Sequence, residues 1–171
     1  MAVFESAAEG SDLESRSLAQ LESFVSARLT SEKTLGDCEE ILGLMPDLDD
    51  QPGLKEAYRK VILKMIDLAT TTEEALSILQ SYESDEARSE FDILILRRAL
   101  ALAATSQEAG EVHEETEEGS EFEREVFVVW TSFLQTVEEC QDMWDEHGTD
   151  TECGKLAILR AGEIISTAKA S

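Results

Sequence analysis

The sequence predicts an all-α fold: an α-solenoid-like array of about four stacked antiparallel helical hairpins, preceded by an N-terminal helix. Only 2 of the 171 residues are Pro and 9 are Gly, and 6% are aromatic, which favours helices over a β-sandwich. Threonines recur at intervals of 31 to 37 residues, each before an amphipathic helical pattern. A second helical pattern follows each of the first four threonines, and paired helices at this period are typical of stacked hairpins.

The first helix of each hairpin is predicted to begin at a threonine cap. An acidic residue follows three positions after each cap, as in a capping box, where hydroxyl and carboxylate each accept a hydrogen bond from the other residue's backbone N–H. The predicted caps are Thr34, Thr71, Thr105 and Thr136. Their acidic partners are Asp37, Glu74, Glu108 and Glu139, of which the shorter Asp37 is expected to form the poorer box. Thr167 lies where a fifth unit would begin.

Side chains of one kind recur at fixed distances from these threonines. Four residues after each cap the residue is small: Cys38, Ala75, Ala109 and Cys140. Ten residues before the next threonine, in the second helix, the residue is apolar each time: Val61, Ile95, Val126 and Ala157. Each helix is therefore predicted to bury one face. His113 takes a position that is Leu42, Leu79 or Trp144 in other units, so a half-buried histidine is expected.

The domain organisation follows from composition. Residues 1–16 are small, polar and acidic, which predicts a disordered tail, and 17–171 are predicted to form a single helical-repeat domain with units starting near 34, 71, 105 and 136. The last unit has no following first helix, which favours a partner or a homodimer at the C-terminal end. No signal-peptide pattern and no apolar run of about 18 residues occurs, and the three cysteines form no disulfide framework. A cytoplasmic protein is expected.

The residues that could carry chemistry have simpler structural interpretations. Cys140, His147 and Cys153 are spaced too widely for a zinc site, and the cysteines occupy small or apolar positions of the repeat. Asp47–Asp50 lacks the glycine and glutamate of a calcium loop. His113 has no second histidine four residues later, although an acid–base pair with Glu114, Glu117 or Glu118 is a third hypothesis. We therefore expect no enzyme activity, no metal and no cofactor.

The charge of the chain limits its partners. Lys and Arg number 14 against 38 Asp and Glu, a net charge of −24, which argues against direct binding to nucleic acids or anionic membranes. Residues 106–125 hold nine glutamates and one arginine, and are either a solvated helix face or a docking ridge for a basic partner. The candidate partner-binding residues are Glu111, Glu114, Glu115, Glu117, Glu118 and Glu121.

Most bases lie in the second helices: Lys55, Arg59, Lys60, Lys64, Arg97, Arg98, Lys155 and Arg160. Some of them are expected to neutralise neighbouring carboxylates of the first helices. The function these features favour is a non-enzymatic protein-interaction module that binds a basic or peptide-like protein partner. The alternative is an acidic antagonist that mimics nucleic acid and blocks a DNA- or RNA-binding protein. Trp130 and Trp144 are either partner anchors or core residues.

One segment carries a resemblance. The segment Leu68–Leu79 reads Leu-Ala-Thr-Thr-Thr-Glu-Glu-Ala-Leu-Ser-Ile-Leu, and similar residues recur from Thr105 and from Thr136. This pattern resembles a bacterial helical-hairpin repeat whose units start Ala-Thr-Thr-x-Glu-Glu-Ala. The units are also similar in length to tetratricopeptide hairpins, although the Trp, Leu-Gly and Tyr of that family's opening are missing. The resemblance spans roughly residues 30–167 and implies a helical-repeat architecture, with no activity attached to it.

Overall fold

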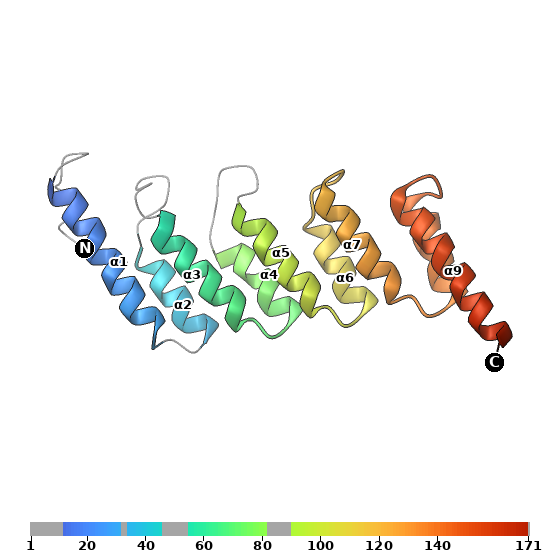
Figure 1. Cartoon of the computed structure of the whole chain (residues 1–171), viewed down its shortest axis with the longest axis horizontal. Coiled ribbons are helices and arrows are strands. Elements are labelled where there is room, and N and C mark those ends of the chain that lie inside the picture. Colours follow the sequence, from blue (N-terminus) through green and yellow to red (C-terminus); the bar gives the residue numbers. More distant parts are fainter. Residues whose placement is uncertain (1–11, 32–33, 46–54, 82–89, 171) are drawn as a thin grey trace. The chain divides into compact units, whose positions relative to one another are not determined.

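The computed structural model describes residues 12–31, 34–45, 55–81 and 90–170, and within these ranges all regular structure is helical (Figure 1). The helices are α1 (Asp12–Leu29), α2 (Leu35–Gly43), α3 (Lys55–Leu68), α4 (Thr72–Ser81), α5 (Glu90–Leu102), α6 (Ser106–Glu114), α7 (Glu121–Ser132), α8 (Val137–His147) and α9 (Glu152–Ala170). The predicted all-α class is confirmed. Residues 12–16 were predicted as part of a disordered tail but belong to α1, where Asp12 stands at the helix start, the end that favours negative charge. Residues 1–11 lie outside the described part.

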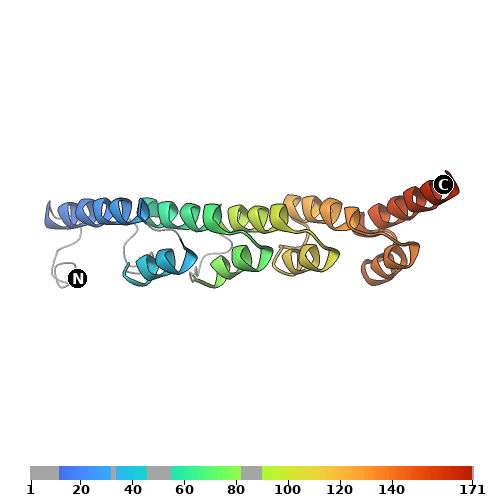
Figure 2. The same ribbon diagram turned by 90° about the horizontal axis from the view of Figure 1, so that it is seen from below.

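The chain divides into two compact units. The first comprises Met1–Ala69 with Ser77–Phe91, and the second comprises Thr70–Leu76 with Asp92–Ser171. In the first unit, α1 and α2 both pack against α3. In the second unit, α6 packs against α7, and α9 packs against both α7 and α8 (Figure 2). The functional residues discussed below all belong to the second unit.

The threonine caps make the hydrogen bonds of a capping box. The Thr34 hydroxyl accepts from the Asp37 N–H at 3.2 Å, and the Asp37 carboxylate accepts from the Thr34 N–H at 3.0 Å. Thr136 and Glu139 make the same pair at 3.1 and 2.9 Å. Both boxes are complete, so the expectation of a poorer box at Asp37 is wrong: the shorter side chain reaches the cap N–H.

The glutamates of the boxes reach one residue farther back than aspartate does. The carboxylates of Glu74, Glu108 and Glu139 accept from the N–H groups of Thr70, Ala104 and Gln135 at 2.7, 2.9 and 2.7 Å. These backbone hydrogen bonds hold the pKa of each carboxyl below its ordinary value, because they favour the charged form. Each glutamate thus stabilises a helix start at neutral pH, and this contribution is lost as the pH falls below about 4.5.

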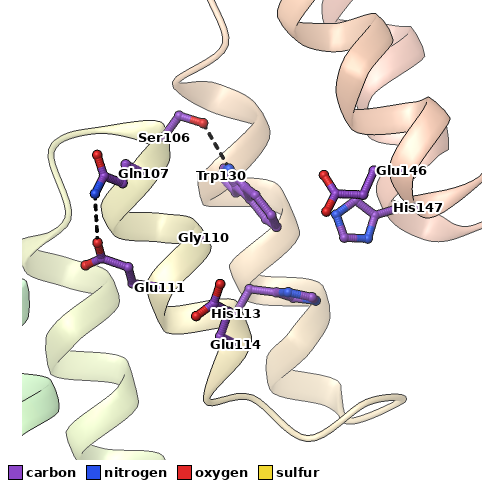
Figure 3. Close-up of a pocket in the computed structure, with 9 residues that line it drawn as sticks. All are labelled: Ser106, Gln107, Gly110, Glu111, His113, Glu114, Trp130, Glu146 and His147. Carbon is purple, nitrogen blue, oxygen red and sulfur yellow. Dashed lines mark hydrogen bonds between the residues drawn. The ribbon is translucent and has the colours of Figure 1, made fainter.

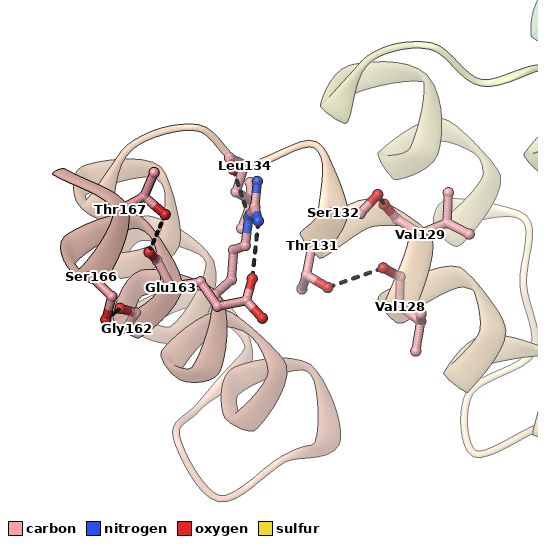
Figure 4. Close-up of polar contacts among 10 residues, drawn as sticks. Val128, Val129, Thr131, Ser132, Leu134, Gly162, Glu163, Ser166 and Thr167 are labelled. Atoms are coloured by element: carbon pink, nitrogen blue, oxygen red, sulfur yellow. Dashed lines mark hydrogen bonds and ion pairs between the residues drawn. The ribbon is translucent and has the colours of Figure 1, made fainter. Parts of the chain in front are cut away.

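Two caps were not predicted, and one threonine does not start a helix. The Ser120 hydroxyl accepts from the Glu123 N–H at 3.1 Å to cap α7, and Thr151 accepts from the Gly154 N–H at 3.0 Å at the start of α9. Thr167 lies inside α9, and its hydroxyl donates to the Glu163 carbonyl at 2.9 Å (Figure 4). The interpretation of Thr167 as the start of a further unit is therefore wrong.

The predicted buried positions are buried. The small residues four positions after each cap and the apolar residues ten positions before the next threonine are all 0% exposed: Cys38, Ala75, Ala109, Cys140, Val61, Ile95, Val126 and Ala157. All three cysteines are buried and form no disulfide. Burial raises the pKa of the Cys140 thiol, and raises that of Cys153 to about 12.

The thiols are expected to resist thiol–disulfide exchange in the folded protein. Because the thiolate is the nucleophile and burial disfavours it, a disulfide reagent such as Ellman's at about pH 8 is expected to react ~100-fold more slowly than with an exposed thiol. The measurement is the rate of reagent release before and after unfolding in guanidinium chloride. A Ser132→Cys variant, which places a thiol at an exposed site, supplies the fast reference. Three thiols reacting at that reference rate would contradict the assigned burial.

Three arginines of the second unit form ion pairs within or between α5, α7 and α9. Arg97 Nη2 lies 2.8 Å from Glu125 Oε1 and joins α5 to α7, while Arg124 Nε lies 3.1 Å from Glu152 Oε1 and joins α7 to α9. Arg160 pairs with Glu163 of its own helix at 3.0 Å, and its Nε donates to the Leu134 carbonyl at 3.0 Å. Arg97 and Arg124 thus join neighbouring helices, and Arg160 pairs within its own helix. None of these three ion pairs involves a carboxylate of α6 or α8.

Candidate functional site

A pocket of about 570 Å³ opens between α6, α7 and α8 (Figure 3). Residues of α6 form one side, Trp130 of α7 forms the floor, and two residues of α8 face them from the other side. The lining residues are Ser106, Gln107, Gly110, Glu111, His113, Glu114, Trp130, Glu146 and His147. The pocket therefore combines carboxylates with aromatic rings, and every lining residue belongs to the second unit.

Trp130 is held in place by two residues one helical turn apart on α6. Its indole Nε1–H donates to the Ser106 hydroxyl at 2.9 Å. Gly110 leaves room for the ring, because a Cβ at this position would come within 3.2 Å of the indole Cζ2. The indole is thus positioned before any ligand arrives, which lowers the entropy cost of binding on its surface.

The two histidines of the chain extend this aromatic surface. The ring centroid of His113 lies 5.3 Å from that of Trp130, and the His147 ring lies 5.4 Å from both and is close to perpendicular to each. Phe127 is buried behind them, 4.9 Å from His113 and 5.9 Å from His147. These separations are typical of edge-to-face and tilted aromatic contacts, so the four rings form one packed cluster.

His147 favours its neutral form. Burial lowers its pKa, His113 acts in the same direction, and the nearby carboxylates of Glu146 and Glu123 oppose them. Its Nε2 is buried and has no hydrogen-bond partner among the described residues. Desolvation disfavours the imidazolium, so near neutral pH the ring adds aromatic surface without adding positive charge.

Three carboxylates belong to residues that line the pocket. Glu111 accepts a hydrogen bond from Gln107 at 3.1 Å, and Glu114 and Glu146 are exposed at the pocket. Within the described ranges, no Lys or Arg side chain forms an ion pair with any of the three. The pocket therefore carries negative charge that the described bases do not neutralise.

Of the six glutamates predicted to bind a partner, two line this pocket. Glu111 and Glu114 line it from α6, although the Glu111 carboxylate points toward Gln107 and away from Trp130 (Figure 3). The other four are exposed at the end of α6, in the turn that follows and at the start of α7, outside the pocket lining: Glu115, Glu117, Glu118 and Glu121. Glu146 and His147 were missed as site residues because their approach to α6 depends on how α8 packs beside α6, and these two helices are not consecutive in the sequence.

The alternative chemistries gain no geometric support. The carboxylate that approaches His113 is that of Glu123, whose Oε1 lies 3.5 Å from Nε2, and not that of Glu114, Glu117 or Glu118. In the parts of the chain described above, no cluster of three His, Cys, Asp or Glu side chains could hold a metal ion. Asp47–Asp50 lies outside the described residues. Trp144 packs against the core of α8 and α9 and does not line the pocket.

Comparisons with protein-family models, with curated proteins and with solved structures found no match to this chain. None of the helices within the described ranges has the length and apolar character needed to cross a membrane.

The buried imidazole of His147 is expected to make the fold sensitive to mild acid. Its pKa is lowered from the ordinary 6.5, so below that pH the unfolded chain binds more protons than the folded one, and stability falls as the pH falls from about 6.5 toward the folded value. In His147→Phe, which keeps a ring and removes the titrating group, this part of the pH dependence is expected to disappear. Denaturant unfolding of both proteins between about pH 7.5 and 5 measures the difference. The same dependence of the unfolding free energy on pH in both proteins would contradict this role of His147.

Proposed function

We propose that this chain is a non-enzymatic protein-interaction module, built of stacked helical hairpins, that binds a basic, peptide-like segment of a protein partner. The observation that carries the proposal is the pocket between α6, α7 and α8, whose lining combines aromatic rings with Glu111, Glu114 and Glu146. Carboxylates without a basic partner attract cations, and fixed aromatic rings supply apolar contact area. The net charge of −24 supports the steering of a basic partner toward the chain.

The proposed repeat architecture is supported by features that recur at the same positions relative to each threonine cap. Capping hydrogen bonds are made by Thr34, Thr71, Thr105 and Thr136, and the side chain four residues later is buried each time. Stacked hairpins of this kind offer extended surfaces for peptides. The charge-based alternative, a mimic of nucleic acid, needs carboxylates spaced along a face like phosphates, whereas the carboxylates of the pocket line it together with aromatic rings.

The same proposal includes a homodimer in which a second copy of the chain binds at the C-terminal end. The helix α9 leaves Ile158, Leu159 and Ile165 exposed by 44%, 66% and 42%. Exposed apolar side chains on one helix favour association. Light scattering after gel filtration is expected to give the mass of a dimer, and Leu159→Glu is expected to give the mass of a monomer. A monomeric unmodified chain would rule out this contact.

The basic-partner proposal is tested with a fluorescently labelled peptide of alternating Arg and Ser. The full chain is expected to bind it, with affinity falling about tenfold as NaCl rises from about 50 to about 300 mM. The control peptide carries citrulline, the uncharged isostere, in place of each Arg. Equal binding of the two peptides, or no binding of the Arg peptide at low salt, would reject the proposed function.

A further inference from the structure

We propose that the pocket between α6, α7 and α8 binds one arginine side chain of the partner, with the guanidinium against Trp130 and between Glu114 and Glu146. This inference rests on the proposed function, because it names the side chain through which a basic partner is recognised. It adds a specific subsite to what would otherwise be a diffuse acidic surface.

The charge of the pocket favours a cation. Glu114 of α6 and Glu146 of α8 bring carboxylates to it from two helices (Figure 3). Like charges gathered at one place repel, and a cation placed among them relieves that repulsion. The bases of neighbouring helices are engaged elsewhere, since Arg97 pairs with Glu125, Arg124 with Glu152 and Arg160 with Glu163.

The shape of the pocket favours arginine over lysine. A guanidinium is planar, carries five N–H donors and is less strongly hydrated than an ammonium group, so it can stack on an indole while donating to carboxylates on more than one side. The indole of Trp130 is already fixed by Ser106 and Gly110, and its own N–H is occupied. A lysine would reach one carboxylate as a point charge and would gain less from the ring.

The pocket is large enough for this occupant. Its volume of about 570 Å³ falls within the range of sites that hold small ligands, ~300 to 1,000 Å³, so one side chain and a few waters fit. The neighbouring imidazole of His147 is buried at its Nε2 and favours the neutral form, so it places no competing cation there.

The test uses the full chain carrying Trp144→Phe, so that tryptophan fluorescence reports Trp130 alone. The probes are three peptides that differ at one position: acetyl-Gly-Ser-Xaa-Ser-Gly-amide with Arg, Lys or citrulline. The Arg peptide is expected to change the Trp130 emission and to bind more tightly than the Lys peptide, while the citrulline peptide leaves the emission unchanged. Equal affinity for Arg and Lys, or an unchanged emission with Arg, would overturn the inference.

Matched carboxylate variants distinguish binding at the pocket from attraction to the overall negative charge of the chain. Glu114→Gln and Glu146→Gln are each expected to weaken binding of the Arg peptide about tenfold, since each removes a charge-assisted hydrogen bond. The control is Glu118→Gln, an exposed carboxylate outside the pocket that loses the same charge, and less than a twofold change is expected there. If all three variants weaken peptide binding equally, the pocket is not the arginine site, while the proposed function still stands. No binding of any basic peptide, the Arg–Ser repeat included, would reject the proposed function itself.

Discussion

Gly154→Ala is expected to destabilise the second unit by about 3 kcal/mol, the upper part of the range for overpacking a tight contact. Gly154 lies in the first turn of α9, where its N–H donates to Thr151 and where a Cβ would collide with the backbone carbonyl of Gly148. The same Cβ would lie 3.0 Å from the Thr149 Cα. Because the obstacle is backbone, the turn between α8 and α9 must move to accept the methyl group.

Gly162→Ala, in the same helix, supplies the matched control. Nothing lies within 4 Å of the Cβ that this substitution would add, so alanine is expected to stabilise α9 by about 0.5 to 1 kcal/mol through its higher helix propensity. Guanidinium unfolding followed by circular dichroism measures both variants. Two glycine substitutions in one helix with opposite signs are the expected result, and a stabilising or neutral Gly154→Ala would show that α8 and α9 do not pack as described.

Ile95→Ala is expected to cost about 3 kcal/mol, within the range of 2 to 5 kcal/mol for emptying a fully buried isoleucine site. Ile95 lies on α5 and is 0% exposed, at the position that is also buried as Val126 and Ala157 in the second unit. Truncation leaves a cavity that the neighbouring helices fill only in part, so the lost contacts add to the lost transfer free energy.

The control for Ile95 is Ile158→Ala on α9, which removes the same atoms from a side chain that is 44% exposed. Its expected cost is below about 1 kcal/mol, because much of that side chain is already hydrated in the folded state. Chemical unfolding at a protein concentration low enough to dissociate dimers keeps association out of the comparison. Similar losses for both variants would contradict the assigned burial of Ile95.

The sequence predicted local structure well because helix starts and buried stripes are encoded by near neighbours. Thr34, Thr105 and Thr136 each precede a helix and accept from the N–H three residues on. Ser120 could have been predicted by the same rule, since Glu123 follows it three residues later and its hydroxyl caps α7. The interpretation of Thr167 was wrong because spacing alone does not distinguish a cap from a mid-helix threonine whose hydroxyl donates back to the Glu163 carbonyl.

The candidate site could be predicted only in part. Glu111 and Glu114 were singled out because they lie in a run of acidic residues, a property of sequence alone. Glu146 and His147 come from α8, and their position across from α6 depends on how the helices pack. Periodicity gave a signal for His147, which occupies the position eleven residues after its cap on the inner helix face, yet it does not say which residues of another helix it meets.

The most direct test of the central proposal is a map of backbone amide and indole shifts in the ¹H–¹⁵N spectrum of the full chain as the Arg–Ser peptide is added. We expect the largest shifts at the Trp130 indole N–H and at the amides of Glu111, Glu114, Glu146 and His147, with residues of α3 unaffected. Shifts confined to other helices, or spread evenly over every acidic surface, would show that this pocket does not receive the partner.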